Sequence, residues 1–127
     1  MNRNVYMSEL IYSQLDYVQN QINEIKKQIE QLDIKINLKG SIFFKYVKCG
    51  KPKCRCAAGE KHGPYPHLQW WDGQRIRTKY LSKKKYLIYK EELEKNKLKE
   101  KLERDLVLLE KKEKRLKATY ENIISKI

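Results

Sequence analysis

The sequence predicts an α+β fold, in which two long helices form an antiparallel coiled-coil hairpin and carry a small three-stranded antiparallel β head stapled by zinc. Apolar residues recur at helical spacing in both flanks of the chain, whereas the middle is short, aromatic and β-branched. Three cysteines and a histidine crowd into fourteen residues of that middle. The predicted divisions are residues 1–39 for the first helix, 40–82 for the head and 83–127 for the second helix.

The first flank carries one apolar seam in which steps of four and three residues alternate. This spacing gives the period of about 3.5 residues that is typical of a coiled coil. Ser8 followed by Glu9 suits the start of the helix, and Gly40 suits its end. The seam consists of Ile11, Leu15, Val18, Ile22, Ile25, Ile29, Leu32 and Ile36.

The second flank follows the same spacing from about Ser82 to Ile127. Leu98 is out of phase with the apolar residues before it, which indicates a local change of register near Asn96. This helix is predicted to extend beyond the first by about ten residues at its end, so we expect a homodimer through that overhang. A parallel homodimer of both helices is the alternative. The seam consists of Tyr86, Tyr89, Leu93, Leu102, Leu106, Leu109, Leu116, Tyr120, Ile123 and Ile127, of which Tyr120, Ile123 and Ile127 form the overhang.

The middle of the chain is predicted to form three short strands. One covers Ser41 to Lys48, and two more, Tyr65 to Trp71 and Gln74 to Leu81, flank Asp72-Gly73. Asp-Gly between two such runs suits a β-hairpin with a two-residue type I′ turn. A β unit of about 40 residues buries little apolar surface and usually needs a staple.

A two-residue turn would pair Trp71 with Gln74 and would fix which side chains share a face. One face then combines an aromatic ring with three cations, which suits phosphate contacts and stacking by Trp70. The alternative is that Trp70 belongs to the core and arginines cover it. The other face is expected to pack against Phe43, Val47 or the helices. The first face carries Leu68, Trp70, Arg75, Arg77 and Lys79, and the second carries His67, Gln69, Trp71, Gln74, Ile76, Thr78 and Tyr80.

The cysteines and histidine suggest a Cys₃His zinc site. Zinc prefers four thiolate or imidazole ligands in a tetrahedron, and its binding energy becomes folding energy in a small domain. Gaps of four, one and five residues differ from the usual zinc-finger gaps, so small core residues and a reactive thiolate are the alternatives. His67 is the alternative fourth ligand. The expected ligands are Cys49, Cys54, Cys56 and His62.

Positive charge is concentrated in the middle of the chain. Lys and Arg number 29 against 16 Asp and Glu, a net charge of +13. Between Lys39 and Lys90, fourteen basic residues stand against only Glu60 and Asp72. Such a field is the expected footprint of a nucleic-acid binding protein. We expect DNA as the partner, with RNA as the alternative, and contacts from Lys45, Lys48, Lys51, Lys53, Arg55, Trp70, Arg75, Arg77, Lys79, Lys83, Lys84 and Lys85.

Other functions have less support in the sequence. A coiled-coil adaptor that recruits a protein partner is the main alternative. A nuclease would need clustered carboxylates, and the head offers two acidic residues, so we expect no enzyme and no small-molecule substrate. No apolar run approaches the roughly 20 residues of a membrane span and no signal peptide is evident, so a cytoplasmic, nucleoid-associated protein is expected. In that compartment, clustered cysteines bind metal more often than they form disulfides.

The stretch from Gly40 to Leu81 resembles a small uncharacterised, zinc-knuckle-like domain family of bacteria and archaea, often encoded near transposases and other mobile elements. The shared motifs are C-G-K-P-K-C-R-C from Cys49, H-G-P-Y from His62 and R-I-R-T-K-Y from Arg75. The resemblance implies the three cysteines and His62 as the metal ligands, since His67 falls where the family usually has an aromatic residue. It implies no activity, and a role as an accessory factor of a mobile element is compatible with it.

Overall fold

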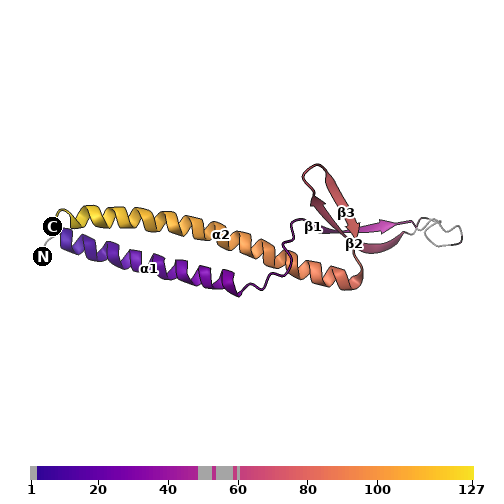
Figure 1. The fold of residues 1–127 in the computed structure, drawn as a ribbon, viewed down its shortest axis with the longest axis horizontal. Coiled ribbons are helices and arrows are strands. Elements are labelled where there is room, and N and C mark those ends of the chain that lie inside the picture. The colour runs from indigo at the N-terminus through magenta and orange to yellow at the C-terminus, as the bar shows by residue number, and fades with distance from the viewer. Residues whose placement is uncertain (1–2, 49–52, 54–58, 60) are drawn as a thin grey trace. The chain divides into compact units, whose positions relative to one another are not determined.

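The computed structural model describes residues 3–48, 53, 59 and 61–127 of the chain. Two helices and one three-stranded antiparallel sheet make up the described residues, which confirms the α+β class (Figure 1). Among these residues, no helix offers an apolar stretch that would cross a membrane. The elements in chain order are α1 (Arg3–Gln31), β1 (Ser41–Val47), β2 (His62–Trp71), β3 (Ile76–Tyr80) and α2 (Lys83–Ile124).

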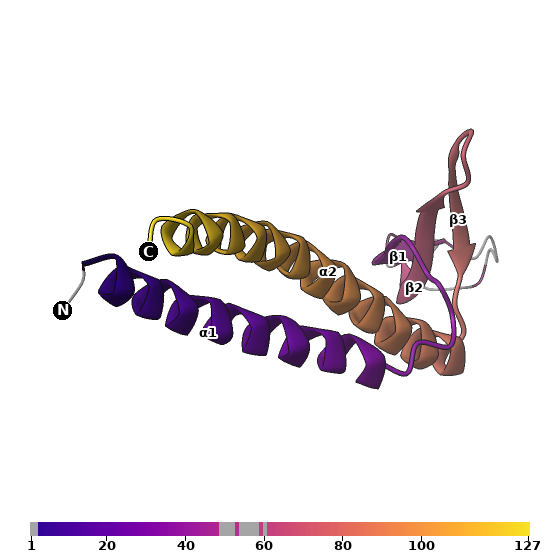
Figure 2. The ribbon, with the colours of Figure 1, turned by 60° about the vertical axis from the view of Figure 1, so that its left-hand side comes forward.

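The chain divides into two compact units, and α2 contributes to both. The helix pair consists of Met1–Asp33 and Leu98–Ile127, and the sheet unit consists of Ile34–Lys97. Within the helix pair, α1 runs antiparallel to the second part of α2, as Figures 1 and 2 show.

The helix pair buries the middle of the apolar seam that the spacing predicts, whereas Ile36 and Ile127 at its ends are exposed. Leu15, Val18 and Ile22 of α1 and Leu102 of α2 are buried. Burial of one such side chain contributes about 1.5–3 kcal/mol to folding, so the seam residues account for the pairing. The predicted seam positions Leu106, Leu109, Leu116, Tyr120 and Ile123 are half-buried.

Both predicted ends of the first helix were wrong. α1 begins at Arg3, and Ser8 lies inside it with a buried side chain. The Ser8 hydroxyl donates a hydrogen bond to the Val5 carbonyl over 2.7 Å, so this serine bonds a preceding carbonyl inside the helix instead of capping the helix start. The helix ends at Gln31 and not at Gly40, so residues 32–40 form a linker to β1.

The predicted overhang of the second helix is absent. Tyr120 lies against Tyr12 of α1, with ring centroids 6.0 Å apart. The expectation failed because α1 starts earlier than Ser8 and because the first part of α2 belongs to the sheet unit. The homodimer itself stays a prediction, without the overhang as its reason.

The sheet has the order β1-β2-β3, with β2 in the centre. Figure 2 shows β2 and β3 as a hairpin with β1 along the other side of β2. Where all three strands overlap, a row of directly opposed residues contains one residue from each strand. Two such rows are Ile42–Leu68–Lys79 and Phe43–His67–Tyr80.

The hairpin loop is wider than the predicted two-residue turn. Trp71 pairs with Ile76, so Asp72 to Arg75 form the loop, and the Asp72 N–H donates to the Arg75 carbonyl over 3.1 Å. The predicted register was therefore wrong by two positions. Because strand side chains alternate with period two, a shift of two leaves every residue of the strands on its predicted face.

The face that packs is the one that carries Leu68 and Trp70, and the expectation that the opposite face packs was wrong. Leu68, Leu81 and Leu93 form the buried core of the sheet unit. The Leu81 N–H donates to the Pro66 carbonyl over 2.9 Å, and α2 begins two residues later at Lys83, which brings the helix under this face. Residues packed against the core are Leu38, Ile42, Trp70, Tyr86 and Tyr89.

This packing corrects the seam predicted for the start of α2. Tyr86, Tyr89 and Leu93 have coiled-coil spacing but pack in the core of the sheet unit. The helix is continuous through Asn96, where the sequence predicts a change of register. The residues before and after that position belong to different units, which is the physical counterpart of the change in phase.

The linker is tied to α2 by two polar side chains. Glu92 is only 5% exposed, and its carboxylate accepts hydrogen bonds from the N–H groups of Lys35 and Ile36 over 3.1 and 3.2 Å. Asn96 Nδ2 donates to the Ile36 carbonyl over 2.9 Å and to the Glu92 carbonyl over 2.7 Å. These bonds satisfy linker backbone groups that have no partner in a helix or strand.

Candidate nucleic-acid interface

The predicted metal ligands lie mostly outside the described residues. These are Cys49, Cys54 and Cys56, whereas His62 is the first residue of β2, is half-buried and stands opposite Val47. Within the described part of the chain, no three His, Cys, Asp or Glu residues come together as a metal site. Zinc therefore stays a prediction that depends on the cysteine segment.

His67, the alternative ligand, has a structural role in the centre of the sheet. Its Nδ1 lies 3.0 Å from the Tyr65 carbonyl, and its ring stacks on Phe43 with centroids 5.4 Å apart. Since a carbonyl oxygen only accepts, Nδ1 carries the proton. The choice between His62 and His67 as the fourth ligand stays a prediction, because the three cysteines lie outside the described residues.

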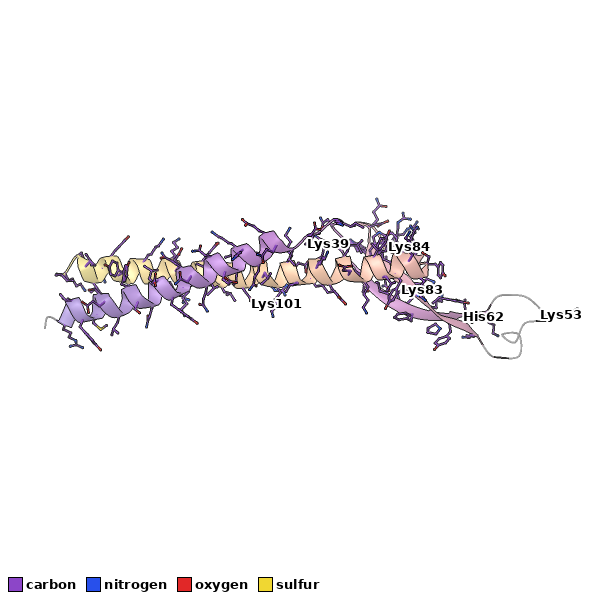
Figure 3. All side chains as sticks on the ribbon, turned by 90° about the horizontal axis from the view of Figure 1, so that it is seen from below. Lys39, Lys53, His62, Lys83, Lys84 and Lys101 are labelled. Atoms are coloured by element: carbon purple, nitrogen blue, oxygen red, sulfur yellow. The ribbon has the colours of Figure 1, made fainter. Side chains whose placement is uncertain are left out.

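The described cations of the predicted interface are all exposed. Lys83, Lys84 and Lys85 form the first turn of α2, which begins after Ser82; the Ser82 hydroxyl accepts the Lys85 N–H over 3.3 Å. Figure 3 shows Lys83 and Lys84 at the start of α2 and His62 at the start of β2. Lys51 and Arg55 lie outside the described residues. The other exposed cations are Lys45, Lys48, Lys53, Arg75, Arg77 and Lys79.

Arg77 is not an isolated cation, because it forms an ion pair with Asp72. The Arg77 hydrogen bond, together with the N–H groups of Arg75 and Gln74, holds the pKa of the Asp72 carboxyl below its ordinary value. Part of the Arg77 charge is thus neutralised within the hairpin. Asp72 forms its ion pair with Arg77 and not with the side chains of Arg75 and Lys79, so it does not neutralise the charges of these two residues.

The cations of the hairpin border an open hollow on the face of Trp70. Its volume is about 420 Å³, and no acidic side chain lines it among the described residues. Such a hollow suits an anionic group that exchanges water for guanidinium and ammonium donors. The lining residues are Trp70, Arg75, Ile76, Arg77, Thr78 and Lys79.

The two adjacent tryptophans have environments opposite to those expected from the sequence, in which Trp70 was to contact nucleic acid and Trp71 was to lie on the packed face. Trp70 is half-buried and packs against the Leu68–Leu81–Leu93 core, so the alternative assignment of Trp70 to the core describes its main role. Trp71 is 65% exposed. Alternation predicts that the two point to opposite faces, but it does not tell which face the helix covers.

The face opposite the core was missed as a candidate surface. We call it the open face, because none of its ten residues is buried. Aromatic residues alternating with cations and small polar residues in the strand sequences were the signal that could have identified it. Its residues are Ser41, Phe43, Lys45, Tyr65, His67, Gln69, Trp71, Ile76, Thr78 and Tyr80.

Comparison with known proteins identifies one family. The family described as Domain of unknown function (DUF6788) matches residues 15–95. No curated protein and no solved structure matches the chain. The matched stretch runs from Leu15 of α1 to Lys95 of α2, so it contains the linker, all three strands and the helical turns that pack under them.

Proposed function

The chain belongs to the family of the Domain of unknown function (DUF6788), and we propose that it is a non-catalytic DNA-binding protein whose sheet unit contacts the phosphate backbone. RNA is the alternative nucleic acid. This function would make it a nucleoid-associated protein of the cytoplasm, and service to a mobile element is compatible with it.

The distribution of charge over the sheet unit carries the proposal. Among the described residues from 39 to 90, Asp72 is the only carboxylate, and it is paired with Arg77. The lysines and arginines of the same stretch are exposed. Neutralising phosphates with such cations releases counterions, which supplies most of the affinity of non-specific nucleic-acid binding.

Zinc is proposed as the staple of the segment between β1 and β2, held by Cys49, Cys54, Cys56 and His62. His62 fits this role, because it is a half-buried imidazole at the first residue of β2 and is held opposite Val47 by strand pairing. Bound zinc would contribute folding energy and no catalysis. We expect one equivalent of zinc in the purified protein, which emission spectrometry measures, and loss of the metal in Cys54→Ser.

The direct test of the proposed function is the salt dependence of binding to a 20-base-pair duplex, measured by fluorescence anisotropy. If six to eight phosphate contacts form, the slope of log affinity against log salt is about −5 to −7. Arg75→Glu with Lys79→Glu should reduce both affinity and slope, the slope by about 2. Lys101→Glu with Lys111→Glu is the matched control, since both lysines are exposed on α2 within the helix pair. A flat salt dependence would contradict the proposal.

A protein–protein adaptor is the second candidate, and the helix pair provides the observation that favours it. Tyr6, Leu10 and Tyr17 of α1 are 52%, 45% and 63% exposed, and their spacing places them along one side of the helix. Exposed apolar stripes of this kind mark protein contacts. Unchanged duplex affinity in the well-folded Arg75→Glu, Lys79→Glu protein would favour the adaptor over the nucleic-acid binding protein.

A further inference from the structure

We propose that the open face of the sheet is a stacking platform for single-stranded nucleic acid. This inference rests on the proposed function and deepens it, because it names the form of nucleic acid and a surface distinct from the cations that contact phosphate. Single-stranded DNA and RNA share the chemistry that the face would recognise, namely unpaired bases on a phosphate backbone.

A row of three rings crosses the sheet, with one ring from each strand. Phe43, His67 and Tyr80 occupy directly opposed positions. The Phe43 and His67 rings are 5.4 Å apart and nearly parallel, at 22°, whereas His67 and Tyr80 are 5.8 Å apart at 71°. Aromatic rings gathered on a strand surface offer π-faces on which successive unpaired bases stack.

The row is held in place by its own contacts. The His67 Nδ1–H donates to the Tyr65 carbonyl over 3.0 Å, and the Tyr65 ring lies 6.0 Å from the Tyr80 ring. His67 therefore has little freedom to turn, and its Nε2 is left as an acceptor when the ring is neutral. A fixed platform loses little side-chain entropy when a ligand binds.

The open face exposes more apolar surface than a solvated sheet face requires. Trp71, Ile76 and Tyr80 are 65%, 59% and 56% exposed. Exposed apolar side chains gathered on one face of a sheet indicate a binding site. The ligand that binds here must cover these apolar side chains and must also carry negative charge that complements the positive charge of the sheet unit.

Polar groups on the same face fit the rest of a nucleotide. Ser41, Gln69 and Thr78 form the row next to the rings, and they separate it from the Trp71–Ile76 pair. Gln69 is half-buried, whereas Ser41 and Thr78 are exposed. Their hydroxyl and amide groups both donate and accept hydrogen bonds, as the edges of unpaired bases require.

Charge complementarity favours nucleic acid over an apolar protein partner. Lys45 is opposite Tyr65 on the open face itself, where an exposed ammonium group can contact a phosphate. In a duplex the bases stack on each other and their faces are closed to such a platform, whereas splayed single-stranded bases stack on protein rings. The combination of rings, polar groups and one lysine therefore indicates a single strand.

The test compares four fluorescein-labelled probes of equal length at one salt concentration. These are a thymidine 20-mer, a uridine 20-mer, an abasic phosphodiester chain and a 20-base-pair duplex. We expect the thymidine 20-mer or the uridine 20-mer to bind the full-length protein at least tenfold more tightly than the abasic chain, because only they offer bases. The ratio of the affinities for the thymidine 20-mer and the uridine 20-mer tells whether DNA or RNA is the natural ligand.

Variants of the ring row should act on base-containing probes alone. Tyr80→Ala and Phe43→Leu each lower the affinity for the 20-mers roughly tenfold and leave the affinity for the abasic chain unchanged. Tyr80→Phe keeps the ring and should restore binding. Tyr6→Ala removes a tyrosine of similar exposure from α1 and is the matched control. Far-ultraviolet circular dichroism shows whether each variant is folded, and Phe43→Leu keeps most of the apolar volume.

The outcomes separate this inference from the proposed function. Equal affinity for the 20-mers and the abasic chain would overturn the stacking platform and leave phosphate binding by the sheet unit intact. Undiminished binding of the 20-mers by a folded Tyr80→Ala, Phe43→Leu double variant would overturn it as well. Failure to bind any of the four probes would overturn both proposals.

Discussion

The carboxylate of Asp72 pairs with the guanidinium of Arg77 across the loop between β2 and β3. The other oxygen of the same carboxylate accepts the N–H groups of Gln74 and Arg75, each over 2.8 Å. One aspartate therefore shapes the loop and partly neutralises a cation of the candidate interface. This role explains why the Asp-Gly sequence gives a wider loop here than a type I′ turn.

The ion pair predicts a pH dependence of stability. Because the folded-state pKa of Asp72 lies below its ordinary value, its contribution is present above the unfolded-state pKa and is lost as the pH falls through the lowered folded-state pKa. In an NMR titration, the Asp72 carboxyl should titrate below an ordinary aspartate, and Arg77→Ala should raise its midpoint. An unchanged midpoint in Arg77→Ala would contradict the assigned cause.

Glu92 is predicted to stabilise the fold through the linker. Glu92→Ala leaves the N–H groups of Lys35 and Ile36 without their acceptor and should lower the free energy of unfolding by about 2 kcal/mol. Glu91→Ala is the control, because Glu91 is the sequence neighbour of Glu92 and its own side chain is 70% exposed; this variant should change stability by less than about 0.5 kcal/mol. Urea denaturation measures both, and equal losses would show that the buried carboxylate has no special role.

Gly40 is predicted to be required by a close approach of the linker to β2. A Cβ at this position would lie 2.4 Å from the Gln69 carbonyl oxygen, and its φ is +143°. Gly40→Ala should therefore lower the melting temperature more than Gly73→Ala, whose φ is +99° but whose Cβ would meet no atom within 4 Å. Gly73→Ala isolates the backbone cost of about 1 kcal/mol. Equal melting temperatures for the two variants would mean that the contact with Gln69 relaxes freely.

The two adjacent tryptophans are predicted to have separate effects. Trp70→Ala removes a ring that packs on the core and should lower the free energy of unfolding by about 2–3 kcal/mol. Trp71→Ala removes a ring that is 65% exposed and should leave stability nearly unchanged while it weakens binding to single strands. Chemical denaturation gives the first quantity and anisotropy the second. A large stability loss in Trp71→Ala would contradict the assignment of the open face.

The helices and the buried seam could be predicted because their spacing repeats over many turns. Leu15, Val18 and Ile22 are buried as that spacing requires. The same rule failed for Tyr86, Tyr89 and Leu93, because it fixes which side of a helix is apolar and not whether a helix or a sheet covers it. Ends of helices depend on single residues such as Ser8 and Gly40, which suit more than one local structure.

The candidate site could be predicted only in part, for a related reason. Strand alternation gave the membership of each face even though the register was wrong, since the error was an even number of residues. The covered face could not be predicted, because Trp70 and Trp71 give both faces a large ring and the choice depends on the path of α2. Glu92 has no sequence signal that distinguishes it from Glu91.

The most direct test of the account is amide chemical-shift mapping of the ¹⁵N-labelled full-length protein as the thymidine 20-mer is added. If the open face binds the strand, the shifts that move belong to residues 34–97, with the largest changes along Phe43, His67 and Tyr80. Shifts confined to residues 3–33 and 98–127, or no shifts at a saturating concentration of the strand, would contradict it.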